Sequence, residues 1–347
     1  MRNPQTTRRI TRADVARLAG VSTAVVSYVL NNGPAPVAPA TRERVENAIE
    51  VLGYRRNASA RALATGSSRL LGVILPDIGN PFFSEVALSI EAAANLHGYA
   101  VLLSNSNNEP HTELDAIQNL VERGVDSLLL SSVLPVPDVT VAQRANVRTV
   151  LLNVFMPRPG YLTVGVDATA GAYAAVSHLI DHGHRSVALI IGRVNSPSLE
   201  AREEGWLRAL DDAHVNPGPI IRTAFSREGG HEAAKRMFSA REHPTAVFIS
   251  SDLQAVGALS ALHELGLRVP EDIAVISFDG TAESKFAIPA LTTVRQPIAE
   301  MSTALVELAL STAPSDEHRS FPTELIIRES CGTNHPTDHR RRVPVAD

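Results

Sequence analysis

The first 66 residues concentrate side chains that could bind the phosphates of a nucleic acid. They contain ten arginines and four acidic residues, a formal charge of +6, although the whole chain of 347 residues carries −5. The remaining residues therefore carry −11. A small basic segment joined to a large acidic one predicts a nucleic-acid reader attached to a part that does a different job.

Three histidines are spaced closely enough to suggest a metal site. His178, His182 and His184 fall within seven residues, and the first two are spaced i, i+4, as on one helix face. Because no cysteine or acid at ligand spacing accompanies them, a metal sensor is the weaker alternative and we expect no bound metal. The single cysteine, Cys331, excludes a disulfide framework and a multi-cysteine site.

Nucleotide-dependent enzymes and hydrolases carry short motifs that this sequence lacks. No GxGxxG follows the first apolar strand, and neither GxxxxGK[ST] nor GxSxG occurs. An enzyme is therefore a disfavoured alternative, and the sequence indicates no cofactor.

The apolar runs are too short to span a membrane. The longest, LLGVIL (70–75) and VALIIG (187–192), fall well below the roughly 18 residues that a bilayer requires. The arginine-rich start is not followed by an apolar stretch of the signal-peptide type. We therefore expect a cytoplasmic protein with no membrane partner.

The first 53 residues read as three short helices. Thr11 with Asp14 resembles a capping box, and Val15, Leu18 and Ala19 form one apolar face. Ser22 is the predicted N-cap of a second helix that runs to about residue 31. The third helix ends at residue 53 and carries apolar residues at 45, 48, 49 and 52. A fourth segment, NASARALATG (57–66), is a helix that is marginal without a partner.

Residues 70 to about 290 alternate buried-type strands with amphipathic helices, which is the pattern of parallel α/β sheets. The predicted strands are 70–76, 100–105, 127–131, 148–153, 163–167, 186–191, 245–250 and 273–278. This length exceeds one ordinary sheet, and FMPRPGYLT (155–163) is a Pro/Gly break. The predicted fold class is α/β, with an all-α helix-turn-helix domain before two parallel-sheet subdomains.

A series of ordered motifs between residues 10 and 331 resembles the LacI/GalR family of transcriptional repressors. The motifs are ITRADVARLAGVSTAVVSYVLNN, TRERVENAIEVLGY, ASARALA, GVILPDIGNPFFSEV, HLIDHGHRSVALI, AREEGW, SDLQAVGALSALHELGLRVPEDIAVISFDG and LTTVRQP. The resemblance implies a sequence-specific regulator whose operator affinity is switched by a small molecule, a sugar or related metabolite. That effector lies between two periplasmic-binding-protein-like subdomains.

The resemblance also implies a domain division in which the chain crosses between subdomains near 162, 292 and 322. The expected parts are a DNA-binding domain (1–56), a hinge helix (57–67), an N-subdomain (68–162 and 293–322), a C-subdomain (163–292 and 323–332) and a tail (333–347). No leucine heptads follow Cys331, so we expect a homodimer on an inverted-repeat operator of double-stranded DNA.

The start of the second helix carries the residues that would read DNA. A helix fits the major groove, where base edges differ for every base pair, so its exposed start needs short polar side chains. Together with Thr11, the candidates are Ser22, Thr23, Ala24, Ser27, Tyr28 and Asn31. Val25 replaces a usual Thr of the family and Tyr28 a usual Arg, which predicts a shifted operator preference.

The hinge adds a second mode of DNA recognition. In the family, paired hinge helices enter the minor groove and a leucine wedges a central base step. Leu63 matches that leucine, Ala60 matches the close helix contact, and Asn57 and Arg61 could contact phosphates. Arg56 stands where the family often has Pro, which implies a less rigid entry to the hinge. An ordinary core role for Leu63 is the alternative.

The candidate effector site follows the rule that parallel sheets bind ligands outside the carboxyl ends of their strands. The residues that match the family's ligand contacts are Asp77, Phe82, Phe83, Asn153, Asp167, Arg202, Phe225, Ser251, Asp252 and Asp279. Carboxylates and an arginine fork can bind paired hydroxyls, while aromatic faces cover the apolar side of a sugar ring or a base.

Several of these candidates have structural alternatives. Asp77 and Asp167 could cap the helices that follow them, Asp252 could brace a loop, and Phe83 could be a core residue. Arg202 is the strongest candidate, because an arginine that faces a cleft requires an anionic or hydroxyl-rich partner. A periplasmic sugar-binding protein would share the fold, but the basic helix-turn-helix and the absence of a signal-peptide pattern argue against it.

Overall fold

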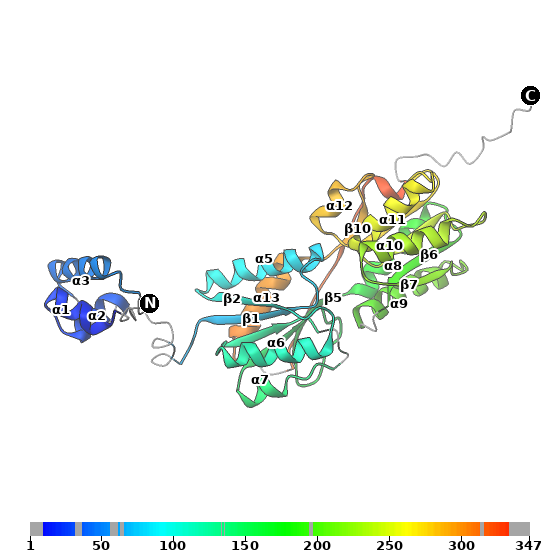
Figure 1. Cartoon of the computed structure of the whole chain (residues 1–347). Helices are drawn as coiled ribbons and strands as arrows, with labels where there is room; N and C mark the ends of the chain where they lie inside the picture. Colours follow the sequence, from blue (N-terminus) through cyan, green and yellow to red (C-terminus); the bar gives the residue numbers. More distant parts are fainter. Residues whose placement is uncertain are drawn as a thin grey trace, which may run out of the picture. The chain divides into compact units, whose positions relative to one another are not determined.

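The computed structural model describes residues 10–31, 37–55, 62, 66–132, 134, 136–193, 197–312 and 316–332. The chain divides into two compact units, Met1–Ser68 and Arg69–Asp347 (Figure 1). No single helix among these residues is long and apolar enough to cross a membrane, although the bent pair Arg12–Ala19 and Thr23–Leu30 meets those criteria together.

The first unit contains α1 (Arg12–Ala19), α2 (Thr23–Asn31) and α3 (Pro39–Leu52). The Asp14 carboxylate accepts hydrogen bonds from the N–H and the hydroxyl of Thr11, at 2.9 and 2.6 Å. Gly20 ends α1 in the left-handed conformation at φ 64°, which a side chain would disfavour. The three helices therefore lie within one residue of their predicted bounds.

The core of the first unit corrects one prediction about α1. Val15, Val26 and Val45 are fully buried where the three helices meet. Leu18, predicted on the buried face, is 53% exposed, and Ala16 is buried in its place. The reason is that α1 packs against both α2 and α3, so its buried face includes small residues that allow close approach.

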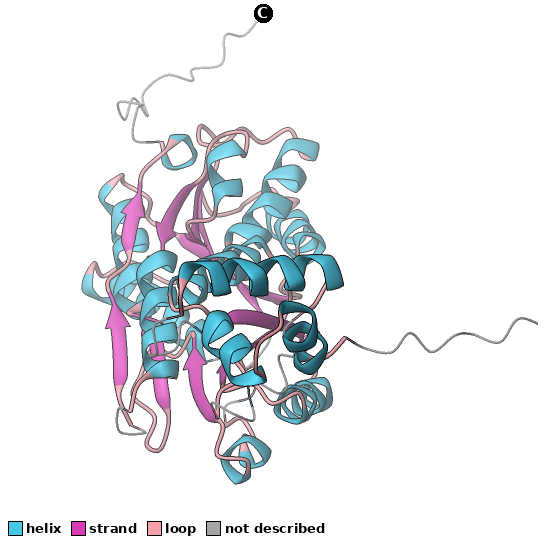
Figure 2. Ribbon diagram, turned by 90° about the vertical axis from the view of Figure 1, so that its left-hand side faces the viewer, coloured by secondary structure: helices cyan, strands magenta, loops and turns pink. Residues whose placement is uncertain are grey.

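The second unit contains two six-stranded sheets flanked by helices (Figures 1 and 2). Sheet order is β11-β5-β4-β3-β1-β2 in the first and β12-β10-β9-β8-β6-β7 in the second. The strands are β1 (Leu70–Leu75), β2 (Ala100–Asn105), β3 (Ser127–Leu130), β4 (Arg148–Leu152), β5 (Leu162–Val166), β6 (Val187–Gly192), β7 (Ile220–Thr223), β8 (Ala246–Ile249), β9 (Ala274–Asp279), β10 (Thr292–Arg295), β11 (His318–Phe321) and β12 (Glu324–Ile326). Strand pairing is parallel except between β10 and β12.

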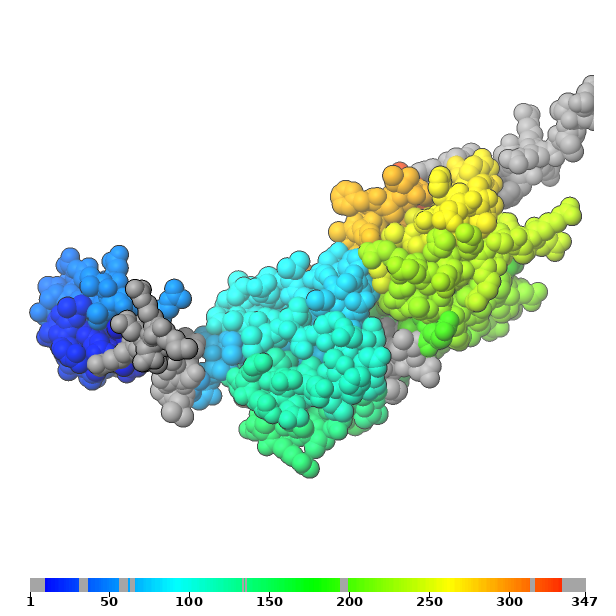
Figure 3. Space-filling model, viewed as in Figure 1, coloured from blue at the N-terminus to red at the C-terminus, as the bar shows by residue number. Residues whose placement is uncertain are grey.

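The helices of the second unit pack on these sheets, as the alternating pattern predicts. They are α5 (Pro81–Leu96), α6 (Pro110–Glu122), α7 (Thr140–Arg144), α8 (Ala168–Asp181), α9 (Pro197–Asp212), α10 (Arg227–Phe238), α11 (Asp252–Glu264), α12 (Ala282–Phe286) and α13 (Ile298–Leu310), with the 3₁₀ turn η1 (Glu329–Cys331). Helices α5, α6, α7 and α13 contact the first sheet, and α8 to α11 contact the second. We call the first sheet with its helices the N-subdomain and the second sheet with its helices the C-subdomain (Figure 3).

The chain passes between the subdomains after β5, after β10 and between β11 and β12. Because β5 pairs with both β4 and β11, the first sheet extends to Val166, beyond the predicted division at 162. The second passage follows Arg295 rather than 292, since β10 pairs with β9 along its whole length. The strands β7, β10, β11 and β12 were not predicted, because each has only three or four residues.

Candidate DNA-binding surface and effector site

The start of α2 presents the predicted polar surface. The Ser22 hydroxyl oxygen accepts a hydrogen bond from the Val25 N–H at 3.3 Å, so Ser22 caps the helix as predicted. Ser22, Thr23 and Ala24 are exposed, Tyr28 is 40% exposed, and Ser27 is partly buried. Thr11 is also exposed. This arrangement leaves one end and one face of α2 open to a partner, as a major-groove helix requires.

Several predicted DNA contacts are not tested by the structure. Asn57, Ala60, Arg61 and Leu63 lie outside the described residues, as does the side chain of Asn31. The minor-groove wedge therefore stays a prediction from the motif.

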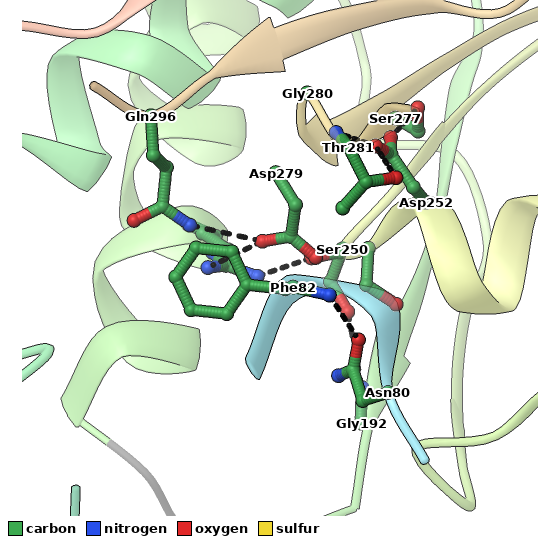
Figure 4. A network of polar contacts seen from close by, with 12 residues as sticks. Asn80, Phe82, Gly192, Ser250, Asp252, Ser277, Asp279, Gly280, Thr281 and Gln296 are labelled. Atoms are coloured by element: carbon green, nitrogen blue, oxygen red, sulfur yellow. Dashed lines mark hydrogen bonds and ion pairs between the residues drawn. The ribbon is translucent and has the colours of Figure 1, made fainter. Parts of the chain in front are cut away.

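At the carboxyl edge of the second sheet, a buried ion pair joins two of the predicted effector residues (Figure 4). Arg202, on α9, donates from Nη2 to Asp279 Oδ1 at 3.3 Å and from Nη1 to the carbonyl oxygen of Ser250. The guanidinium also lies 4.0 Å from the centre of the Phe278 ring. Both charged side chains are about 4% exposed, so each depends on the other for compensation of its charge.

Burial changes the acid–base properties of this pair. Loss of solvation raises the pKa of Asp279 to about 7, although the neighbouring Arg202 guanidinium favours the ionised carboxylate. Burial also lowers the pKa of Arg202, and Asp279 opposes that change. The carboxyl group of Asp279 can therefore exist in either protonation state near neutral pH, accepting hydrogen bonds in one and also donating in the other.

Gln296 completes this site and was not among the predicted residues. Its Nε2 donates to Asp279 Oδ1 at 3.0 Å. Its Oε1 and the Nε of Arg202 are buried polar atoms that find no hydrogen-bond partner among the described residues. Such atoms are costly unless something binds them, and a buried donor together with a buried acceptor suits a hydroxylated or amide-bearing ligand. The only sequence signal was its place in the motif LTTVRQP.

The N-subdomain contributes the start of α5 to this region (Figure 4). Asn80 caps the helix by accepting from the Phe82 N–H at 3.0 Å. Phe82 and Phe83 are buried, with ring centroids 5.2 Å apart in an edge-to-face arrangement. A proline at position 81 and this cap fix where α5 begins, and so place Phe82 beside the polar network that Figure 4 draws.

Asp252 acts within the C-subdomain rather than toward an open space. Its Oδ1 accepts from the hydroxyls of Ser277 and Thr293, at 2.5 and 2.7 Å. Its Oδ2 accepts from the N–H and hydroxyl of Thr281, at 2.7 and 2.9 Å. Burial raises the pKa of Asp252 despite these four bonds. Its neighbour Ser251 caps α11 by accepting from the Gln254 N–H. The structural alternative, a residue that braces a loop, therefore describes Asp252, and Ser251 is a helix cap.

The other predicted residues are not joined to the Arg202–Asp279 pair by any hydrogen bond found among the described residues. Asp77 accepts from the Gly79 N–H at 2.8 Å, and Asn153 follows β4 at φ 64°. Asp167 caps α8 by accepting from the Ala170 N–H and is exposed. It lines a separate depression with Tyr173, Arg208 and Asp212. Phe225 follows β7, and its ring covers Gly192.

The three histidines have separate partners. His178 Nε2 lies 3.4 Å from Cys331 Sγ, His182 Nδ1 lies 2.7 Å from the His178 carbonyl oxygen, and His184 Nδ1 lies 2.8 Å from the Thr245 hydroxyl. Within the described residues, no group of three or more His, Cys, Asp or Glu side chains could hold a metal ion.

Comparisons with known proteins agree with this architecture. Residues 11–57 match the family model "Bacterial regulatory proteins, lacI family", and residues 176–331 match "Periplasmic binding protein-like domain". The repressor CytR of Escherichia coli K12 is 37% identical over 328 residues, covering 92% of this chain and 96% of CytR. The repressor PurR of Haemophilus influenzae is 34% identical and covers 91% and 97%.

Among solved structures, the Lac repressor dimer bound to operator and the anti-inducer ONPF has a TM-score of 0.84 at 29% identity. The match covers 93% of this chain and 99% of that one. Together with the helix-turn-helix unit and the two-sheet unit, these similarities confirm the predicted family and fold class. The chain belongs to the lacI family of bacterial regulatory proteins.

Proposed function

We propose that this protein is a homodimeric transcriptional repressor that binds an inverted-repeat operator. Its affinity for that operator decreases or increases when a small molecule binds its core. The observation that carries the proposal is the exposed polar start of α2 within a unit that matches the lacI helix-turn-helix model. CytR and PurR, which match this chain over most of their length, are named as repressors. We infer a regulator without catalytic activity, acting in the cytoplasm.

We infer that the DNA contacts come from Thr11, the start of α2 and the hinge. Tyr28 stands on the exposed face of α2, where its hydroxyl can bond one base edge but cannot make the bidentate contact of an arginine. From the hinge motif, Leu63 is the proposed minor-groove wedge. We also propose the domain division that the family resemblance implies, with one change. The first passage between the subdomains follows Val166.

We infer that the effector binds beside Arg202, Asp279, Gln296 and Phe82. The free Arg202 Nε supplies a donor, Gln296 Oε1 supplies an acceptor, and the Phe82 ring supplies an apolar face. A hydroxyl-rich ring, such as a sugar or a nucleoside, offers the complementary groups on its edge and its face. Asp167 and Asp252 are the least supported of the predicted contacts, because hydrogen bonds within the protein use their carboxylates.

Selection of operator DNA from a random library by the full-length protein tests the proposal. We expect an inverted repeat whose binding weakens steeply with salt, because several arginines displace counterions from the phosphates. Tyr28→Ala should change the selected half-site and weaken binding to the wild-type site by about 1 to 3 kcal/mol. Val51→Ala, which alters an exposed apolar residue on α3, is the control; Val51 is 76% exposed, more than Tyr28.

Two results would contradict the proposal. One is a selection that returns no common sequence. The other is an equal effect of the Tyr28 and Val51 substitutions on operator affinity, which would show that the start of α2 does not read the DNA.

A further inference from the structure

The loop between β9 and α12 (residues 279–282) touches both the effector site and the other subdomain. It begins with Asp279, which pairs with Arg202. Two residues later, Thr281 binds Asp252 through its N–H and hydroxyl. At its end, the Ala282 N–H donates a hydrogen bond of 2.8 Å to Oε1 of Glu85, which lies on α5 of the N-subdomain. Only two residues, 280 and 281, separate the effector-site contact at Asp279 from the contact at Ala282 with the other subdomain.

The loop has a backbone conformation that its neighbours must maintain. Asp279 has φ 118° and Gly280 has φ 74°, and a non-glycine residue at such an angle is strained. Gly280 cannot be replaced by a larger residue, because an added Cβ would lie 2.4 Å from the Arg295 Cα. The conformation persists because hydrogen bonds at 279, 281 and 282 hold it from several sides.

Glu85 satisfies a donor that the loop itself cannot satisfy. The first N–H groups of a helix have no intrahelical acceptor, and an N-cap side chain reaches only the N–H groups of the second and third helical residues. Thr281 is the N-cap of α12 and Ala282 is its first residue, so the Thr281 hydroxyl, which donates to Asp252, does not serve the Ala282 N–H. The Ala282 N–H is bonded by a side chain from the other subdomain. The start of α12 is therefore completed across the boundary between subdomains.

The position of Glu85 on α5 links it to the aromatic side of the effector site. Phe82 and Val86 on the same helix are buried, while Glu85, between them in sequence, is partly exposed. A shift of α5 against the C-subdomain would move the Phe82 ring and the Glu85 carboxylate together, because a helix moves as a rigid element. Such a shift would lengthen the bond to Ala282 and release one of the contacts that hold the Asp279 loop.

We propose that Glu85 is a positioning residue that couples the arrangement of the two subdomains to the conformation of the effector-site loop. This inference rests on the proposed effector function and adds to it a specific mechanical contact. Movement of the subdomains breaks the Glu85–Ala282 bond and relaxes the Asp279 loop. An effector that holds Asp279 in place favours the bonded arrangement.

Hydrogen–deuterium exchange on the full-length, unliganded protein tests the contact directly. In Glu85→Ala, the peptide that contains the Ala282 amide should exchange about 2- to 10-fold faster, the equivalent of one lost hydrogen bond. Glu85→Gln should restore protection, because its amide oxygen is still an acceptor. Glu91→Ala removes an exposed carboxylate from the same helix and should leave exchange of this peptide unchanged.

Operator affinity measured on the same proteins tests the coupling. Glu85→Ala should change the affinity of the unliganded protein by about 2- to 10-fold, since a contact can shift an equilibrium only by its own differential energy. Glu85→Gln and Glu91→Ala should match the wild type. Unchanged exchange in Glu85→Ala, or Glu85→Gln exchanging as fast as Glu85→Ala, would overturn the contact. Altered exchange with unchanged operator affinity would overturn the coupling.

The two proposals fail in different ways. If the wild type and every variant bind no operator, the proposed function is wrong, and the exchange result still decides whether Glu85 holds the loop.

Discussion

Arg202 and Asp279 illustrate how a buried charge is tolerated at the scale of single residues. The guanidinium lies between the Asp279 carboxylate, the Ser250 carbonyl oxygen and the Phe278 ring. These contacts use two of its nitrogens and leave Nε without a partner among the described residues. The two side chains therefore compensate each other's charge and still leave one donor to offer, which is the property that a binding residue needs.

A double-mutant cycle should show that the two charges depend on each other. At pH 8, Arg202→Met should destabilise the protein by about 3 to 5 kcal/mol, because it leaves a buried carboxylate unpaired. Adding Asp279→Asn should recover part of that loss, since no charge then remains. Urea unfolding of the two single variants and the double variant supplies the measurement. A double variant as unstable as the sum of the single ones would argue against a coupled pair.

The raised pKa of Asp279 predicts the sign of a pH dependence. Between about pH 4 and pH 7, the folded state holds a proton on Asp279 that the unfolded state has released. The contribution of the protonated Asp279 carboxyl group to stability is therefore fully present below about pH 4 and is lost as the pH rises to about 7. The free energy of unfolding changes by at most about 1.4 kcal/mol per pH unit in this range.

The loss should be visible in the difference between the unfolding free energies of the wild type and Asp279→Asn, measured from pH 5 to pH 8. The wild type should lose stability relative to the variant as the pH rises to 7, and the difference should be constant above that. A difference that grows in favour of the wild type with rising pH would refute the raised pKa. Glu91→Gln is a control at an exposed carboxylate.

At the scale of elements, glycines set how closely helices approach around the second sheet. A Cβ added at Gly257 on α11 would lie 1.8 Å from the Arg227 carbonyl oxygen, at the start of α10. Gly230 on α10 meets the Gln254 carbonyl oxygen of α11 at 2.0 Å in the same way. The two helices therefore contact each other backbone to backbone, which fixes Asp252 and Ser251 at the start of α11.

Gly257→Ala should destabilise the protein by about 2 kcal/mol or more, because backbone atoms cannot move aside as a flexible side chain can. Gly79→Ala is the matched control, since its added Cβ would meet only the Asp77 carboxylate, at 3.0 Å. Thermal unfolding of both variants decides the matter. Equal melting temperatures for the two variants would mean that α10 and α11 are not closely packed.

At the scale of the whole molecule, two parallel-sheet subdomains share three chain passages and one continuous group of buried residues. In the N-subdomain, β5 ends at Val166 and β11 ends at Phe321, each just before a passage. In the C-subdomain, β10 ends at Arg295, before the remaining passage. Three connections permit bending about their common region more readily than separation. We expect a ligand that binds both subdomains to select one arrangement of them, and the affinity for the operator to depend on that arrangement.

Effector and operator should therefore change each other's affinity by the same factor, typically about 5- to 150-fold. Screening sugars, sugar phosphates and purines by thermal shift identifies the effector, because a ligand of the native state raises its melting temperature. Titrating that compound with and without the selected operator then measures the coupling. An operator with scrambled half-sites is the control. If the affinity for the effector is the same with and without the selected operator, an allosteric switch is excluded.

Local patterns in the sequence determined the elements and the family of this protein. Apolar spacing, Ser22, Gly20 and Gly53 defined the three first helices to within about one residue, because caps and periodicity act over a few neighbours. Alternating apolar strands and helices predicted most of the two sheets for the same reason. The missed strands β7, β10, β11 and β12 have three or four residues each, too few for a local apolar pattern to define a strand, and pairing with other segments of the chain defines them.

Only the tertiary structure decided which polar residues meet. Arg202, Asp279 and Gln296 come from three separate segments, and their contact depends on how α9, β9 and β10 pack. Packing also exposed Leu18, turned Asp252 inward and brought Glu85 to Ala282 across 197 residues of sequence. A sequence pattern reports the preference of a residue for burial or for a cap, but the identity of its distant partner depends on the summed packing of the whole domain.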